Sequence, residues 1–409
     1  MRPILIATIL LSIAAAYYIY IPLPSTLTEP WKLMYTDAMI RSSMQLSFLA
    51  HDFGLTSPFG FLKYFSSLMD VKSNLSSSSV RITEASFGGV EALVFESTAG
   101  QEKTLKRGVV YLHGGGWTVG SAKMEAYYLQ CMEMAKQLDA VVLSVEYRLA
   151  PDGRFPDQYN DVFQASKHIL TTEVLSRYSI DPKRVAVSGD SAGGNLAAAV
   201  AQQISVDSSV PIKFKLQALI YPVLQGLDFN TPSYQQNAFT PILYRPLVAR
   251  FWLEYLNGKQ ILLSAMLANI QSAQDQGPKI EAARAKIDWT RLLPVAFQKS
   301  YKPVFPLYGD PKLLEKLPGL LDVRAAPLLA ESEVLKAVPP AYIMTCEHDV
   351  LRDDGLMYAT RLQQAGVHVT LDHYEDGFHG CLSFAFGPLS FEVGRRSFGN
   401  YIQWLKDNL

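Results

Sequence analysis

A serine set between glycines is the residue in this chain of 409 with the clearest capacity for chemistry. Gly189-Asp190-Ser191-Ala192-Gly193 fits the pattern G-x-S-x-G, after the apolar run RVAVS and before the alanine-rich run NLAAAVA. This order predicts a strand, a sharp turn and a helix that together present the serine hydroxyl as a nucleophile. The alternative is an ordinary glycine-rich turn in which Ser191 caps the helix. The strand-like and helix-like flanks favour the nucleophile.

A serine hydroxyl becomes a good nucleophile only when a neighbouring base takes its proton. The chain has seven histidines, and His379 is the last of them, in the glycine-flanked segment EDGFHG after an apolar run. A loop at the end of a strand can bring a base to the serine, so we predict that His379 is this base. His373 lies on the expected strand itself, which favours a structural role.

An acid must orient the histidine and stabilise its charged form, and it should lie between the serine and the histidine in the chain. The segment AYIMTCEHDVLRDDG supplies Asp349 at the end of an expected strand, followed by Asp353 and Asp354. The later pair stands where the next helix begins, and acidic residues are favourable there. We therefore predict that Asp349 is the acid and that Asp353 and Asp354 cap the helix.

Three consecutive glycines follow a histidine in VVYLHGGGWTVGS, at positions 109–121. Bare backbone of this kind can bind a phosphate or the oxyanion of an acyl-transfer reaction, but phosphate loops carry a lysine that is absent here. We predict an oxyanion motif over His113, Gly114 and Gly115. The N–H groups of Gly114, Gly115 and Ala192 are the expected donors, and a purely structural turn is the alternative.

Strands and helices must alternate along the chain to position these residues. Residues 80–87 and 90–97 read as a hairpin, and later apolar runs rich in Val, Ile and Leu are separated by helix-length segments. This pattern predicts an α/β fold with a mostly parallel sheet covered on both faces. The expected strands of that sheet cover 108–113, 140–147, 184–190, 216–222, 341–349 and 368–380.

More than 100 residues separate the fourth and fifth of these runs, far more than one crossover helix needs. We assign 229–325 to an inserted helical cap, with helices expected over 244–258 and 261–275. Residues 25–79 are expected to form further, short cap helices. The α/β core then comprises 80–228 and 326–409.

The first residues form an apolar segment with no charge between Arg2 and Glu29. We predict a transmembrane signal anchor over 4–24, because a helix of ~20 residues is about 30 Å long. Positive charge favours the cytoplasmic side. The tip 1–3 is therefore expected in the cytosol and the rest of the chain across the membrane.

Two other interpretations of this segment remain, a signal peptide cleaved after the alanines at 14–16 and a buried core helix. The sequon Asn74-Leu75-Ser76 is a candidate glycosylation site and is compatible with a location outside the cytosol.

Composition excludes several classes of partner. The chain has 37 basic and 38 acidic residues, a net charge of −1 and no basic block, so we expect no nucleic acid partner. Cys131, Cys346 and Cys381 have no metal-ligand spacing and leave open either one disulfide or three buried thiols. We expect no metal and no cofactor, and the oligomeric state does not follow from the sequence.

Four segments taken together resemble a known group of proteins. HGGGW, YRLAP, GDSAGGNLAAA and EDGFHG are similar to the hormone-sensitive lipase group of α/β-hydrolases. The N-terminal segment and EHDVLRDDGLMY resemble the arylacetamide deacetylase family within it. The resemblance implies an α/β-hydrolase fold, a catalytic triad at Ser191, Asp349 and His379, and the oxyanion motif at 113–115. Val350 departs from the proline that many members of the group have after the acid.

The same resemblance implies a single-pass type II protein of the endoplasmic reticulum membrane with a luminal catalytic domain. It implies hydrolysis of lipid esters such as cholesteryl esters and acetylated alkylglycerol ethers. Alternatives are an amide and ester hydrolase of broad specificity and a non-catalytic ligand-binding relative. The aromatic and aliphatic cap residues favour lipid esters.

Overall fold

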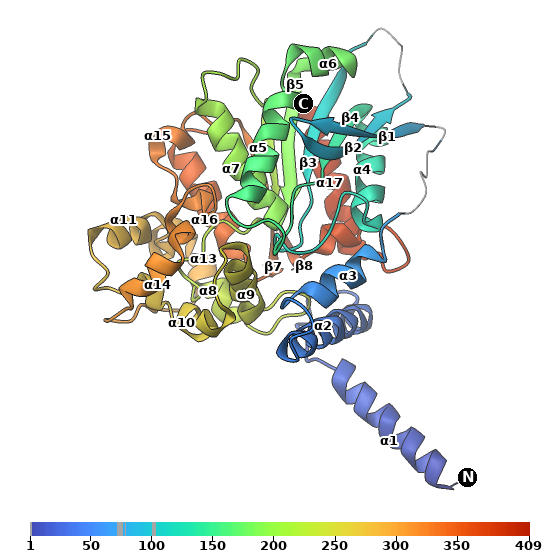
Figure 1. Cartoon of the computed structure of the whole chain (residues 1–409), viewed down its shortest axis with the longest axis vertical. Helices are drawn as coiled ribbons and strands as arrows, with labels where there is room; N and C mark the ends of the chain where they lie inside the picture. Colours follow the sequence, from blue (N-terminus) through green and yellow to red (C-terminus); the bar gives the residue numbers. More distant parts are fainter. Residues whose placement is uncertain (1, 72–76, 78, 100–103) are drawn as a thin grey trace.

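An eight-stranded sheet forms the centre of the computed structural model, which describes residues 2–71, 77, 79–99 and 104–409 (Figure 1). The strand order is β1-β2-β4-β3-β5-β6-β7-β8. The pairs β1–β2 and β2–β4 are antiparallel and all the others are parallel, which confirms the predicted mostly parallel sheet. The strands are β1 (Val80–Phe87), β2 (Val90–Ser97), β3 (Lys106–Leu112), β4 (Ala140–Val145), β5 (Ile180–Asp190), β6 (Leu216–Ile220), β7 (Ala341–His348) and β8 (Val369–Phe378).

Helices cover both faces of the sheet, which explains why its central strands are apolar without alternation. Every residue of β4 and β6 is buried. One face packs against α5, α7 and α16, and the other packs against α4 and α17. The core helices are α4 (Glu125–Leu138), α5 (Asp157–Ile169), α6 (Thr172–Arg177), α7 (Ala192–Val206), α16 (Arg352–Gln364) and α17 (Glu392–Asn408).

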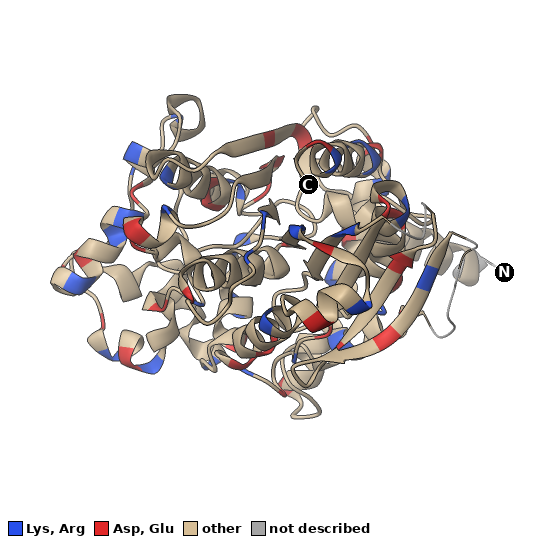
Figure 2. Cartoon of the chain, turned by 90° about the horizontal axis from the view of Figure 1, so that it is seen from above, with Lys and Arg blue, Asp and Glu red and all other residues tan. Residues whose placement is uncertain are grey.

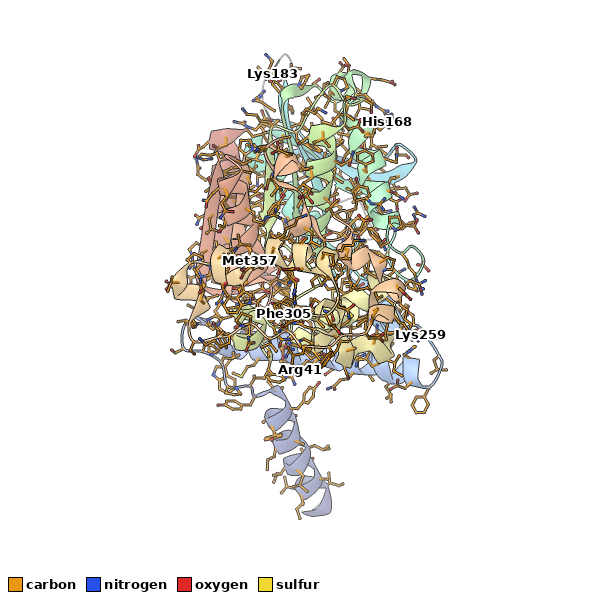
Figure 3. The ribbon with its side chains drawn as sticks, turned by 90° about the vertical axis from the view of Figure 1, so that its left-hand side faces the viewer. Arg41, His168, Lys183, Lys259, Phe305 and Met357 are labelled. Carbon is orange, nitrogen blue, oxygen red and sulfur yellow. The ribbon has the colours of Figure 1, made fainter. Side chains whose placement is uncertain are left out.

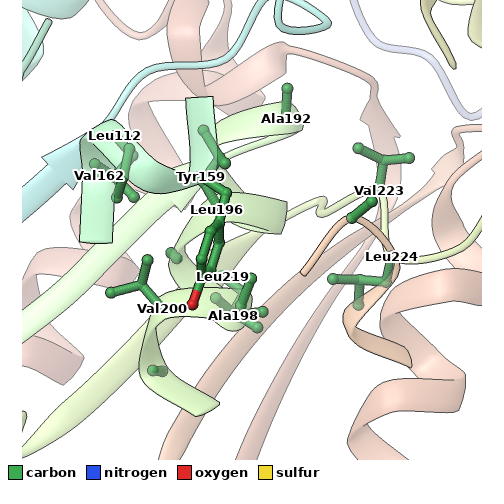
Figure 4. Packing of buried hydrophobic residues seen from close by; sticks show 14 of the residues in the cluster. Leu112, Tyr159, Val162, Ala192, Leu196, Ala198, Val200, Leu219, Val223 and Leu224 are labelled. Carbon is green, nitrogen blue, oxygen red and sulfur yellow. The ribbon is translucent and has the colours of Figure 1, made fainter. Parts of the chain in front are cut away.

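Helix α7 is held firmly against the sheet, and this fixes its first turn. Leu196 and Val200 are fully buried and belong to the same cluster as Leu112 of β3 and Val162 of α5 (Figure 4). Each such side chain contributes about 1.5–3 kcal/mol when it leaves water. The residue that precedes α7 therefore has a rigid support.

The inserted segment between β6 and β7 consists of short helices. The helix expected over 244–258 is confirmed by α9 (Arg245–Tyr255), but the single helix expected over 261–275 is wrong. Asn269 breaks it with a φ of 56°, and its amide bonds to the Phe229 N–H and to Asp228. The remaining elements of the segment are α8 (Pro232–Gln236), η1 (Gln260–Leu262), α10 (Leu263–Leu267), η2 (Ile270–Ser272), α11 (Pro278–Lys286), α12 (Trp289–Leu292), α13 (Val295–Gln298), α14 (Pro311–Lys316), η3 (Pro318–Leu321), η4 (Pro327–Leu329) and α15 (Ser332–Leu335).

Three helices precede the sheet: α1 (Arg2–Ile19), α2 (Pro30–Asp52) and α3 (Gly60–Ser67). Figures 1 and 3 show α1 projecting from the body, at the end across which α2 lies. At 23 residues, α2 is longer than the short cap helices that we expected.

The helix expected over 4–24 ends early, at Ile19, because Pro22 and Pro24 cannot continue it. Within the described residues, none of the helices combines the length and the apolar character needed to cross a membrane. The predicted transmembrane anchor is therefore not confirmed. The sequon at Asn74 lies outside the described residues.

Among the described residues, the charged side chains form no group that could hold a metal ion, and the cysteines form no disulfide. Figure 2 shows Lys, Arg, Asp and Glu spread over the body. Cys131, Cys346 and Cys381 are all buried free thiols, which decides the alternative that the sequence left open. The Sγ atoms of Cys346 and Cys381 lie 3.7 Å apart.

Candidate active site

A strained turn presents Ser191 at the carboxyl edge of the sheet. Ser191 is the single residue between β5 and α7, and its φ of 53° and ψ of −117° are rare for a residue with a side chain. A Cβ at Gly189 would lie 2.5 Å from the Gly193 carbonyl carbon, and a Cβ at Gly193 would lie 2.0 Å from the Leu112 oxygen. The turn therefore requires both glycines. The Ser191 hydroxyl makes no capping bond to α7, which argues against the simple cap.

His379 and Asp349 meet Ser191 in an unbroken chain of hydrogen bonds. His379 Nε2 lies 3.0 Å from Ser191 Oγ, and His379 Nδ1 lies 2.8 Å from Asp349 Oδ2. His379 directly follows β8 and Asp349 directly follows β7, so two neighbouring parallel strands deliver both side chains to one edge. The other oxygen of Asp349 accepts the Leu351 N–H at 2.8 Å. The carboxylate is completely buried and fixed on both sides.

The inserted segment supports the acid from above. The Asn237 amide at the end of α8 donates to the carbonyls of Glu347 at 2.9 Å and Asp349 at 3.0 Å. His373 lies apart from Ser191, with Nδ1 2.9 Å from Thr345 Oγ1, in the structural role that we expected.

Asp353 and Asp354 do not cap α16, contrary to our prediction. Asp353 accepts the Ser233 N–H at 2.7 Å, and Asp354 accepts the Leu224 N–H at 2.8 Å. Both carboxylates are buried, and burial raises the pKa of Asp354 to about 7. They tie the segment after β6 to α16, so long-range partners replace the expected local ones.

The glycine loop after β3 exposes a different pair of N–H groups from the predicted pair. The Gly114 N–H donates to the Tyr127 hydroxyl at 3.1 Å and is therefore occupied. Gly115 and Gly116 line the same cavity as Ser191, with φ values of 109° and 59°. Among the described residues, neither of their N–H groups has an acceptor.

Of the predicted donors in this loop, Gly114 is thus occupied, and Gly115 and Gly116 carry the N–H groups that remain available. The Ala192 N–H starts α7, where a helix supplies no acceptor of its own, and it remains available.

His113 shapes this loop from within the core. Its Nδ1 donates to the Gly114 carbonyl at 2.8 Å, and its ring stacks on Tyr147 at 4.5 Å. Burial lowers the pKa of His113 to about 4, so the ring is neutral at neutral pH. The side chain belongs to the support of the loop, because it lies beneath the glycines and does not line the cavity.

Asp190 is a buried carboxylate to which we assigned no role from the sequence. Its Oδ1 accepts the Tyr111 hydroxyl at 3.1 Å, and its Oδ2 accepts the hydroxyls of Tyr127 and Ser383, each at 3.2 Å. Burial raises the pKa of Asp190 to about 6, although these donors oppose the shift. Because Tyr127 also holds Gly114, Asp190 connects the glycine loop, the Ser191 strand and the loop after His379.

A large apolar cavity of about 540 Å³ opens above Ser191 and His379. Its walls come from α2, α3, α9 and the segment 383–389, which follows the base. Volumes of 300–1,000 Å³ are typical of small-molecule sites. Across the described ranges, no group of His, Cys, Asp and Glu side chains could hold a metal ion. The arrangement is suited to acyl transfer from a hydrophobic substrate.

Comparisons with known proteins show the family to which the chain belongs. Residues 109–302 and 306–383 match the family described as alpha/beta hydrolase fold. Neutral cholesterol ester hydrolase 1 of Bos taurus is 52% identical over 395 residues, which are 97% of each chain. Arylacetamide deacetylase of Oryctolagus cuniculus is 44% identical over 403 residues, 98% of each chain. A solved bacterial heroin esterase is 26% identical, with a TM-score of 0.64 over 94% of this chain and 98% of its own.

Proposed function

We propose that Ser191, His379 and Asp349 form the catalytic triad of this chain. The chain belongs to the α/β-hydrolase family and is a carboxylic ester hydrolase. The hydrogen-bonded chain from Ser191 Oγ through His379 to Asp349 is the observation that carries this proposal. Ser191 Oγ attacks the ester carbonyl while His379 Nε2 takes the hydroxyl proton. His379 then returns this proton to the leaving alcohol, and the acyl group stays on Ser191.

Water completes the reaction by the same route in reverse. His379 removes a proton from the water that attacks the acyl-enzyme, and Ser191 leaves as the restored hydroxyl. Asp349 holds the imidazole in the required tautomer and stabilises its charged form. The bond to the Leu351 N–H keeps this carboxylate in place.

The N–H groups of Gly115, Gly116 and Ala192 would stabilise the oxyanion. The unoccupied donors of the glycine loop and their position beside Ser191 support this assignment. Loss of one such donor typically costs about 2.7–4 kcal/mol of transition-state stabilisation. Gly114 instead anchors the loop through Tyr127.

Lipid esters, cholesteryl esters and acetylated alkylglycerol ethers among them, are the proposed substrates. The name of the Bos taurus relative and the apolar cavity of about 540 Å³ support this class. The arylacetamide deacetylase relative makes amide hydrolysis the second candidate. Turnover of a matched ester and amide with the same acyl group separates the two.

We further propose that α1 attaches the protein to the endoplasmic reticulum membrane, with the catalytic domain on the luminal side. The exposed apolar side chains from Ile4 to Tyr17 support this location. Protection of the intact catalytic domain from protease in sealed microsomes tests it. Digestion without detergent would contradict it.

A fluorophosphonate probe tests the nucleophile. The wild-type chain should be labelled on Ser191 and lose ester hydrolysis, and Ser191→Ala should show neither labelling nor turnover. The matched control is Ser205→Ala in α7, whose hydroxyl donates to the Ala201 carbonyl at 2.7 Å and which should behave as wild type. Labelling that persists in Ser191→Ala would overturn the assignment.

A further inference from the structure

The outward face of α2 carries a stripe of exposed apolar side chains, although Gln45, His51 and Asp52 of this helix are exposed as well. Five apolar side chains of α2 and that of Phe53, which directly follows the helix, are spaced by three, four or seven residues and share this face. Their exposed fractions run from 39% to 73%, although such side chains are normally buried. We call this surface the outer stripe, and it consists of Trp31, Tyr35, Met39, Leu46, Leu49 and Phe53.

The inward face of α2 buries as many polar side chains as apolar ones, whereas a surface helix normally keeps its apolar side chains for the core. The buried side chains are Thr36, Asp37, Ser43 and Ser47 beside Leu33, Met34, Ala38 and Met44. Asp37 receives the Ile242 N–H at 2.8 Å and pairs with Arg41 at 2.5 Å.

The cations of α2 are also withdrawn from the stripe. Arg41 donates to the Tyr18 carbonyl at 3.0 Å, and Lys32 pairs with Glu29 and donates to the Ser390 carbonyl at 2.7 Å. Hydrogen bonds and ion pairs therefore keep these charges away from the exposed apolar side.

Two neighbours indicate what covers the stripe. The first is α1, which leaves the body at the end where α2 lies and exposes apolar side chains on every side (Figures 1 and 3). The second is the cavity above Ser191, whose rim includes Met39 of the stripe and Met69, both about two-fifths exposed. The stripe thus joins an all-round apolar helix to the mouth of an apolar cavity.

We propose that the outer stripe lies on the surface of a phospholipid bilayer and that substrate passes from the bilayer into the cavity between Met39 and Met69. A bilayer is the partner that satisfies α1 and the stripe together, because both face the same side of the molecule. The passage of substrate rests on the proposed ester hydrolase function, whereas the binding of the stripe to lipid does not.

Tryptophan fluorescence of the full chain tests the contact itself. Of the five tryptophans, Trp117, Trp252 and Trp289 are buried and Trp404 of α17 is partly buried, whereas Trp31 is 70% exposed. Phosphatidylcholine vesicles with brominated acyl chains should quench the emission of the wild type. Trp31→Leu should lose most of that quenching. Equal quenching in both proteins would overturn the contact, because the signal would then come from elsewhere.

Kinetics of Leu46→Glu/Leu49→Glu test the passage of substrate. This double variant should raise KM for an ester embedded in vesicles by about tenfold, since two apolar side chains no longer enter lipid. The value of kcat/KM for a short water-soluble ester should stay at the wild-type level. The matched control is Leu105→Glu/Val206→Glu, half-exposed positions at the opposite edge of the sheet, which should change neither quantity.

The outcomes separate the inference from the function on which it rests. An unchanged KM for the embedded ester overturns the proposed passage even if the soluble ester is hydrolysed normally. Absence of turnover on both esters in the wild type instead contradicts the catalytic assignment. A second copy of the chain is the rival occupant of the stripe. Dimers that form without vesicles and dissociate in Leu46→Glu/Leu49→Glu would favour it and overturn the lipid contact.

Discussion

The floor and the lid of the cavity are built on opposite principles. The floor buries ionisable groups, Asp349, Asp190 and His379, at the carboxyl edge of the sheet and satisfies them with hydrogen bonds. The lid, made of α2 and α3, exposes aromatic and aliphatic side chains such as Trp31 and Leu49. The ionisable groups of the floor are thus buried, whereas many apolar side chains of the lid are exposed.

This difference shows where each region finds its partners. The floor is complete within the chain, because each carboxylate oxygen of Asp349 and Asp190 has a donor. The outward side of the lid is not covered in this way. The apolar side chains of the outer stripe are exposed, and none of the described residues packs over them. Substitutions in the floor should therefore change chemistry, and substitutions in the lid should change the attachment of the cap or the supply of substrate.

The largest effect is expected in the floor, at the acid. Asp349→Asn should lower kcat on a short aryl ester by about 10⁴-fold, because the amide favours the wrong imidazole tautomer. The control Asp354→Asn removes another buried carboxylate that bonds to Leu224 and lies outside the triad. It should reduce thermal stability while the folded enzyme keeps its kcat. A loss of less than tenfold in Asp349→Asn would assign the acid's role to another group.

The next effect is expected in the lid, where one aromatic side chain attaches α3 to the inserted cap. Phe59 is buried, stacks on Phe251 at 4.6 Å and meets the edge of Phe48 at 5.7 Å. Phe59→Ala should destabilise this junction by about 3–5 kcal/mol. Limited proteolysis should then cut between α2 and α3.

Phe53→Ala is the matched control, since Phe53 is 73% exposed and its loss should leave the digestion pattern unchanged. Identical digestion of the two variants would mean that Phe59 does not attach the lid. Hydrolysis of a soluble ester at low temperature should persist in both, because neither touches the floor.

A smaller effect in the floor concerns the support of the glycine loop. Tyr127→Phe leaves the buried Gly114 N–H without an acceptor and removes one donor to Asp190. The cost should be about 1–3 kcal/mol in the free energy of unfolding. We expect kcat to fall by about tenfold as the oxyanion donors lose alignment.

Chemical denaturation and steady-state kinetics measure these two quantities. The control is Tyr234→Phe, because the buried Tyr234 hydroxyl has no hydrogen-bond partner within the described ranges. A kcat at the wild-type level in Tyr127→Phe would separate Gly114 from the alignment of the loop.

The smallest effect is a pH dependence of stability from Asp190. The folded protein holds this proton up to about pH 6, whereas the unfolded chain releases it near pH 4. Folding therefore takes up a proton in this window, and the free energy of unfolding falls as the pH rises through it. The slope contributed by one such group is at most about 1.4 kcal/mol per pH unit.

Asp190→Asn should remove this contribution, so its difference in stability from the wild type should change between pH 4 and pH 6 and then level off. Urea denaturation at a series of pH values measures it. A difference that is constant across the series would show that Asp190 does not titrate in this window.

Ser191 and His379 could be predicted because their chemistry requires particular residues next to them in the sequence. A nucleophile between glycines and a histidine after the last strand are local patterns, and the strand order brings them to one edge. The choice between Gly114 and Gly116 was not local. It depends on the Tyr127 hydroxyl, 13 residues later, which occupies one of three similar N–H groups.

Other features were missed because their partners lie far away in the chain. Asp190 is adjacent to the nucleophile, but Ser383, one of its donors, is 193 residues away. Helical spacing predicted helices in the N-terminal segment, yet it could not tell which face of α2 would point outward. A helix expected over 261–275 breaks at Asn269, whose side chain bonds to a segment 40 residues earlier.

The order of the site residues along the chain determines when the protein can first become active. His379 lies 188 residues after Ser191, and a ribosome that adds about 5–20 residues per second reaches it about 10 to 40 s later. The cap helix α2 is made early but is tied to the last helix, since Glu29 accepts the Glu392 N–H at 2.7 Å. A nascent chain therefore exposes the apolar helix α1 long before it can cleave an ester, and hydrolysis begins only after α17 leaves the ribosome.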